Sequence, residues 1–195
     1  MKSFNLVILA LSMVLLAGCG NDGSSPSSNV NAEAGFEERL IAAMAVSETS
    51  LRDETLAALA MGAAKTGEVN IVRRALENIR AKSSEDEARR SCAVALGQSS
   101  LLKDAFSIAE GIQSRELQDD AMVDLAVASS GTGDIKMIKL ALDKISDTTK
   151  QDQATMNSAI SLSKSGDIEM AKSIAERIIN KEVQDKTLHT IATDH

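Results

Sequence analysis

The chain has no tryptophan and no tyrosine, and only three of its 195 residues are phenylalanine. Aromatic rings are the usual platforms for sugars and nucleobases, so their scarcity argues against a protein that binds carbohydrate or single-stranded nucleic acid. Basic residues form no run, and the formal net charge is −7, which disfavours contact with nucleic-acid phosphates. The chain has two histidines, so candidates for catalysis are few. We therefore predict a protein that is not an enzyme and uses no cofactor.

A long apolar run is also missing, because the stretch from Leu6 to Leu16 is too short to span a bilayer. With Lys2 before it, this stretch is typical of a cleaved signal peptide, here residues 1–18. Its end, Leu16-Ala17-Gly18-Cys19, resembles the lipobox of bacterial lipoproteins. The resemblance implies lipid attachment at Cys19, where two or three acyl chains give stable membrane anchoring. An ordinary secretory signal with a stray cysteine is the alternative.

The segment 19–33, which comprises Cys19 and the residues after it, contains the only proline, Pro26, among serines, asparagines and glycines. Such a composition cannot bury apolar surface and predicts a flexible linker. Gly20 follows Cys19, where an aspartate would signal inner-membrane retention in enterobacterial lipoproteins. By the same resemblance, we expect a lipid-anchored protein of the outer membrane that faces the periplasm. In an organism with one membrane, it would lie outside the cell.

Most of the remaining chain repeats itself every 33 residues. Each unit begins with an aspartate, and its eighth residue is alanine: Asp53, Asp86, Asp119, Asp152 and Asp185; Ala60, Ala93, Ala126, Ala159 and Ala192. A fixed period of this length is typical of a stacked array, in which each unit buries its apolar face against its neighbours. The sequence therefore predicts four full units, 53–85, 86–118, 119–151 and 152–184. We expect a capping helix at 34–52 and a C-terminal cap at 185–195.

Within each unit, apolar residues recur at steps of three and four, which predicts two antiparallel helices of about 13 residues each. Between them lies a turn with glycine or serine at the fifteenth position, as in Gly133-Asp134 and Gly166-Asp167. Glycine there can adopt the left-handed conformation that ends a helix, and aspartate can cap the next helix. The predicted fold is all-α, an α-α superhelix (solenoid) of helical hairpins.

The small eighth residue, the Gly-Asp pair and an alanine at the twentieth position resemble the tetratricopeptide repeat. The fourth unit carries all three features, in Ala159, Gly166-Asp167 and Ala171. The consensus aromatics and proline are missing, and each unit is one residue shorter, so another class of helical-hairpin repeat stays open. The resemblance covers Asp53 to the C-terminus, and residues 34–195 are predicted to form one tetratricopeptide-like domain.

Cysteine is scarce as well, because Cys92 is the only one besides the predicted lipid site. The repeat register places Cys92 in a core column with Leu59 and Leu125, so we predict a buried thiol rather than a reactive one. His189 follows Asp185 by one helical turn, but His195 is the last residue given and we expect it to be frayed. We therefore predict no metal site.

In tetratricopeptide folds the first helices of the hairpins line the concave surface, with their second, fifth, ninth and twelfth positions exposed. By that resemblance Gly97, Ser130 and Ser163 would be exposed, and a shallow groove would present an apolar floor and a polar rim. Alternatively, the ninth position is simply core. The predicted partner-binding residues are Arg90, Val94, Val123, Val127, Met156 and Ile160.

Such a groove suits a peptide or a helix of a protein partner. We therefore predict an adaptor or scaffold of the cell envelope that binds a protein partner and reaches the membrane through its lipid. The alternatives are an envelope enzyme built on a helical scaffold and a structural protein without a groove ligand.

Overall fold

The computed structural model describes residues 28–193, and the predicted signal peptide, Cys19 and most of the predicted linker lie outside these residues. Residues 28–193 form ten α-helices and no strand. The all-α prediction is confirmed for this part of the chain. The helices are α1 (Ser28–Met44), α2 (Thr49–Thr66), α3 (Val69–Glu77), α4 (Lys82–Gln98), α5 (Leu102–Glu110), α6 (Arg115–Thr132), α7 (Ile135–Lys144), α8 (Thr148–Lys164), α9 (Ile168–Ala175) and α10 (Lys181–Thr193).

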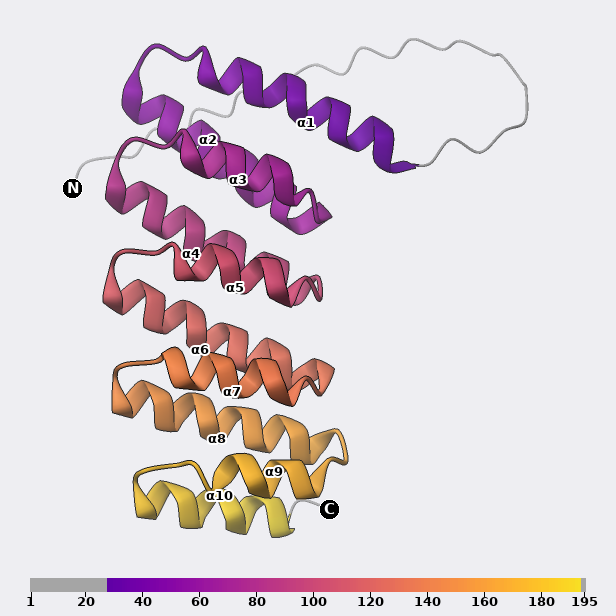
Figure 1. Cartoon of the computed structure of the whole chain (residues 1–195), viewed down its shortest axis with the longest axis vertical. Coiled ribbons are helices and arrows are strands. Elements are labelled where there is room, and N and C mark those ends of the chain that lie inside the picture. The colour runs from indigo at the N-terminus through magenta and orange to yellow at the C-terminus, as the bar shows by residue number, and fades with distance from the viewer. Residues whose placement is uncertain (1–27, 194–195) are drawn as a thin grey trace, which may run out of the picture.

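Consecutive helices pack against one another in an elongated stack (Figure 1). The long helices α2, α4, α6 and α8 lie side by side in that order, and each also packs against the short helix that follows it. α1 packs on α2 and α3 at one end, and α10 packs on α8 and α9 at the other. None of the helices between residues 28 and 193 is both long and apolar enough to span a membrane.

The two helices of each hairpin differ in length, contrary to the expectation of about 13 residues each. The first helices have 17 or 18 residues and the second have 8 to 10. The long helices start four residues before the repeated aspartate, for example at Thr49 before Asp53. α1 likewise starts at Ser28, so residues 28–33 of the expected linker are helical.

The turn inside each hairpin has the predicted left-handed conformation. Its φ angle is +81° at Gly67, +71° at Gly133 and +93° at Gly166, and Ser100 adopts +63° at the equivalent position. Asp134 caps α7 by accepting a hydrogen bond of 3.1 Å from the backbone N–H of Met137. The predicted cap at Asp167 is wrong, because its side chain accepts no such bond from α9.

The core runs along the stack between the long and short helices. The repeated alanines Ala60, Ala93, Ala126 and Ala159 are fully buried, and a methyl group at each lets neighbouring helices approach closely. Cys92 is fully buried as well, which confirms its predicted place in the core. Burial raises the pKa of its thiol to about 12, so the thiol stays protonated and inert at neutral pH.

The aspartates that begin the units hold the loops between hairpins. Asp53, Asp86, Asp119 and Asp152 are all buried, and each carboxylate accepts backbone N–H bonds from the residues 27 and 28 positions later. The distances lie between 2.7 and 3.2 Å. Each aspartate thus satisfies loop donors that would otherwise be unpaired.

Candidate functional site

Two of the open hollows in the described residues are lined by neighbouring long helices alone. The α2–α4 hollow has a volume of about 470 Å³ and is lined by Ser50, Asp53, Glu54, Ala57, Met61, Ser83, Ser84, Glu87, Ala88 and Ser91. The α6–α8 hollow has a volume of about 260 Å³ and is lined by Asp120, Val123, Thr149, Lys150 and Gln153. Both are lined by long helices alone, so the short helices take no part in them.

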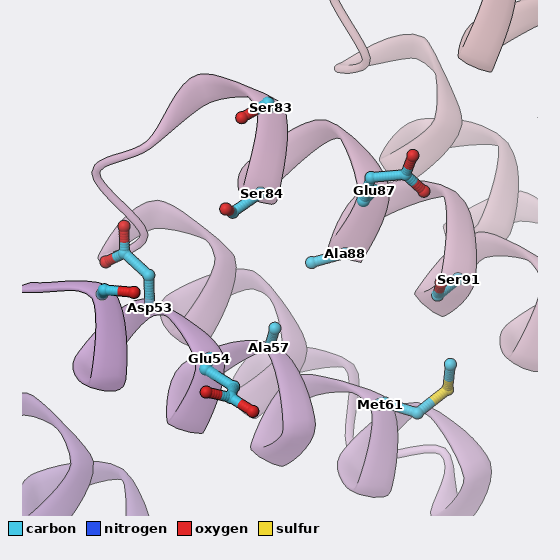
Figure 2. Close-up of a pocket in the computed structure, with 10 residues that line it drawn as sticks. Asp53, Glu54, Ala57, Met61, Ser83, Ser84, Glu87, Ala88 and Ser91 are labelled. Carbon is cyan, nitrogen blue, oxygen red and sulfur yellow. The ribbon is translucent and has the colours of Figure 1, made fainter. Parts of the chain in front are cut away.

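Figure 2 shows how two facing helices build the α2–α4 hollow. Ala57 and Ala88 point toward one another between the helices, and Met61 lies one turn further along α2. These three side chains make an apolar floor, with the hydroxyl groups of serines and two glutamate carboxylates around it. The hollow can therefore hold an apolar stem and a polar or cationic head at once.

The carboxylates of the α2–α4 hollow differ in their surroundings. Asp53 is buried and engaged with the backbone N–H groups of Arg80 and Ala81. Glu54 and Glu87 are exposed, and neither forms an ion pair or accepts a hydrogen bond from any residue between 28 and 193. Two uncompensated negative charges thus border the apolar floor.

The structure brings the six predicted partner-binding residues onto three adjacent helices, Arg90 and Val94 on α4, Val123 and Val127 on α6, and Met156 and Ile160 on α8. Only Val123 lines either of the two hollows. Val123 and Met156 are half-buried against the core, and Val94 and Ile160 are also half-buried, whereas Val127 is 39% exposed.

Arg90 is engaged within the chain, because its guanidinium lies 3.3 Å from the carboxylate of Asp124. Burial raises the pKa of Asp124, and the nearby Arg90 guanidinium acts in the opposite direction. This pair joins α4 to α6, so Arg90 helps to hold the two helices together.

The expectation that the twelfth position of each unit is exposed is wrong. Gly97, Ser130 and Ser163 are all buried. At Gly97 the reason is a close helix approach, since a Cβ atom there would lie 2.9 Å from a methyl group of Leu125 on α6. The face open to a partner is therefore narrower than predicted and lies nearer the N-terminal ends of the long helices.

Sequence reasoning assigned no role to Glu54 or Ser84. A signal existed, because Glu54 and Ser84 have counterparts two units later in Asp120 and Lys150, and those two are ion-paired. Comparing alternate units, rather than consecutive ones, would have singled out this difference.

Within residues 28–193 no three histidine, cysteine, aspartate or glutamate side chains gather as potential ligands of one metal ion. Comparison with protein-family models, with curated proteins and with solved structures found no match to this chain.

Proposed function

We propose that this chain is a lipid-anchored adaptor of the cell envelope that binds a protein or peptide partner on its long helices. The observation that carries the proposal is the α2–α4 hollow, an open apolar floor bordered by two uncompensated carboxylates. A site of this kind takes side chains of an extended or helical partner segment. It favours binding over catalysis, since no histidine and no basic group lines it.

The proposed architecture is a tetratricopeptide-like solenoid of four 33-residue hairpins between α1 and α10. The support comes from equivalent contacts at equivalent positions. Asp53, Asp86, Asp119 and Asp152 follow one another at intervals of 33 residues and bind their loops in the same way. An array of this kind presents neighbouring first helices as one extended binding surface.

The proposed membrane anchor depends on the sequence Leu16-Ala17-Gly18-Cys19, which lies outside the described residues. Lipidation at Cys19 would place the solenoid on the periplasmic face of the outer membrane, with the intervening residues as a tether. Labelling cells with a palmitate analogue tests this part. The label should enter the wild-type protein and be lost from Cys19→Ser, and equal labelling of both would contradict the anchor.

The adaptor proposal is tested by site-specific photo-crosslinking in cells. A crosslinker at Ser91 in the α2–α4 hollow should capture one dominant protein, whereas a crosslinker at the exposed Lys172 on α9 should not. The captured protein is then identified by mass spectrometry. No adduct at Ser91, or the same adducts at both positions, would contradict the adaptor function.

A further inference from the structure

The two hollows are counterparts of one another. All five residues that line the α6–α8 hollow lie 66 positions after residues that line the α2–α4 hollow, as Asp120 lies after Glu54. The hollows are therefore two versions of one surface, separated by two hairpins. The other counterpart pairs are Ala57 and Val123, Ser83 and Thr149, Ser84 and Lys150, and Glu87 and Gln153.

The α6–α8 hollow contains its own cation. The ammonium of Lys150 on α8 lies 2.6 Å from a carboxylate oxygen of Asp120 on α6. The hydrogen bond to Asp120 raises the pKa of Lys150, so this lysine is charged at any physiological pH. With a neutral Gln153 beside the pair, the charged groups of this hollow compensate one another.

The α2–α4 hollow lacks that cation. Ser84 takes the place of Lys150, which leaves Glu54 without the partner that Asp120 has. Glu87 takes the place of Gln153 and adds a second carboxylate. At these counterpart positions the α2–α4 hollow thus carries two carboxylates and no cation, whereas the α6–α8 hollow carries one carboxylate and one ammonium.

We propose that the α2–α4 hollow binds a lysine side chain from a basic segment of the partner protein. That lysine would pair with the carboxylates of this hollow as Lys150 pairs with Asp120 in the α6–α8 hollow. The lysine ammonium would bind Glu54 and Glu87, and its alkyl stem would lie on Ala57, Met61 and Ala88. This inference rests on the proposed adaptor function and names the chemistry of its partner. The complementary charges speed and orient the encounter with a basic segment.

Binding of a fluorescein-labelled pentalysine peptide to the purified full-length protein tests the inference by fluorescence anisotropy. Ser84→Lys supplies the missing ammonium from within, so we expect it to weaken pentalysine binding about tenfold. Glu54→Gln with Glu87→Gln should weaken it at least as much. The matched controls are Ser173→Lys and the pair Glu38→Gln with Glu77→Gln, which change the net charge equally at exposed positions outside the hollow. We expect these controls to alter the affinity less than about twofold.

Loss of binding in the two hollow variants alone would support the inference. Equal losses in the controls, unchanged affinity of Ser84→Lys, or no binding of pentalysine by the wild type would overturn it. Circular dichroism of each variant verifies that the helices are intact. The adaptor function is judged separately: if Ser84→Lys still captures the same protein through the crosslinker at Ser91, the lysine inference fails and the adaptor stands.

Discussion

Neighbouring hairpins fill the same core in opposite ways. In the odd hairpins, α2–α3 and α6–α7, the seventh position of the unit is leucine and the eleventh is small: Leu59 with Ala63 and Leu125 with Ser129. In the even hairpins, α4–α5 and α8–α9, the order is reversed: Cys92 with Leu96 and Ser158 with Leu162. All eight side chains are buried, so large residues meet small ones across each junction.

The short helices alternate in the same sense. The odd hairpins have Ala75-Leu76 and Ala141-Leu142 where the even hairpins have Ile108-Ala109 and Ile174-Ala175, and these residues are all buried. The order of large and small buried side chains therefore recurs every two hairpins, at an interval of 66 residues. The residues that line the two hollows are offset by the same interval.

The largest expected effect on stability comes from truncating a buried leucine at the seventh position of an odd hairpin. Leu125→Ala removes a fully buried side chain and should lower the free energy of unfolding by about 3 kcal/mol, measured by urea denaturation. Gly97→Ala alone should also destabilise, by about 1 kcal/mol, because its new methyl group meets Leu125.

In the Leu125→Ala background that clash is gone, so Gly97→Ala should stabilise by about 1 kcal/mol through its better helix propensity. Additive effects of the two changes would contradict the interlocking of α4 with α6.

The next prediction compares the stability lost on removing a loop-binding aspartate, Asp119, with that lost on removing Asp185 on α10. Asp119→Ala leaves two backbone N–H groups and the Ser146 hydroxyl without their acceptor, which should cost about 2 to 3 kcal/mol. Asp185 on α10 is largely exposed, and among the described residues its one ion pair is with Lys181, so Asp185→Ala should change stability by less than about 0.5 kcal/mol. Similar costs for both substitutions would show that the buried aspartates do not hold the loops.

The same aspartates predict a dependence on pH. Burial by itself would raise the pKa of Asp53, but the N–H groups of Ala81 and Arg80 outweigh it and hold the pKa below its ordinary value. The pKa of Asp119 is lowered in the same way, by Ser146 and Asp147 against the effect of burial. A lowered folded-state pKa stabilises the fold above the unfolded-state value near 4, and the contribution is lost as the pH falls through the folded-state pKa.

Thermal denaturation between pH 7 and pH 2 should therefore show a steep loss of stability in acid. Asp119→Ala should flatten that slope relative to the wild type. An unchanged slope would contradict the assignment of this acid sensitivity to Asp119.

A smaller effect on stability is expected at the seventh position of the two even hairpins. Ser158 on α8 occupies the place of Cys92 on α4, and its buried hydroxyl has no hydrogen-bond partner among the described residues. Ser158→Ala should stabilise the protein by about 1 kcal/mol, because an unpaired hydroxyl is costly to bury. Cys92→Ser introduces a hydroxyl at the equivalent buried position and should destabilise the protein. A Cys92→Ser variant as stable as the wild type, together with a Ser158→Ala variant less stable than the wild type, would contradict this reasoning.

The smallest effect concerns the turn of the first even hairpin. Ser100 adopts a φ of +63° where the other turns have glycine. Ser100→Gly should raise stability by about 0.5 kcal/mol, because relief of backbone strain exceeds the entropy that glycine adds to the unfolded chain. A melting temperature lower than that of the wild type would contradict it, and Gly133→Ser should show the opposite change.

Much of the fold follows from the sequence, because apolar spacing and glycine positions are local signals. They predicted the all-α fold, the left-handed turns and the burial of Cys92. The starts of the long helices were harder to locate, since the residues before each aspartate, such as Lys82 and Ser83, are exposed and carry no apolar pattern. The residue just before such a start is held by the aspartate of the preceding long helix, as the backbone N–H of Ala81 donates to Asp53.

The predicted partner-binding residues overlap with the lining of the two hollows at Val123 alone. Arg90, Val94, Val127, Met156 and Ile160 line neither hollow, because exposure of a helical residue depends on how closely its neighbour packs. The approach of α6 to Gly97 is a tertiary feature that a single-helix pattern does not contain. The difference between Ser84 and Lys150 is visible in the sequence, but the structure is needed to show that both residues line equivalent hollows.

Moving the binding site within one chain tests the central comparison most directly. The quadruple variant Ser84→Lys, Glu87→Gln, Lys150→Ser and Gln153→Glu exchanges the charged groups of the two hollows. Methyl NMR with pentalysine should perturb the methyl signal of Met61 in the wild type, and that of Val123 in its place in the variant. If Met61 still responds in the variant, or Val123 does not, the two hollows are not interchangeable lysine sites.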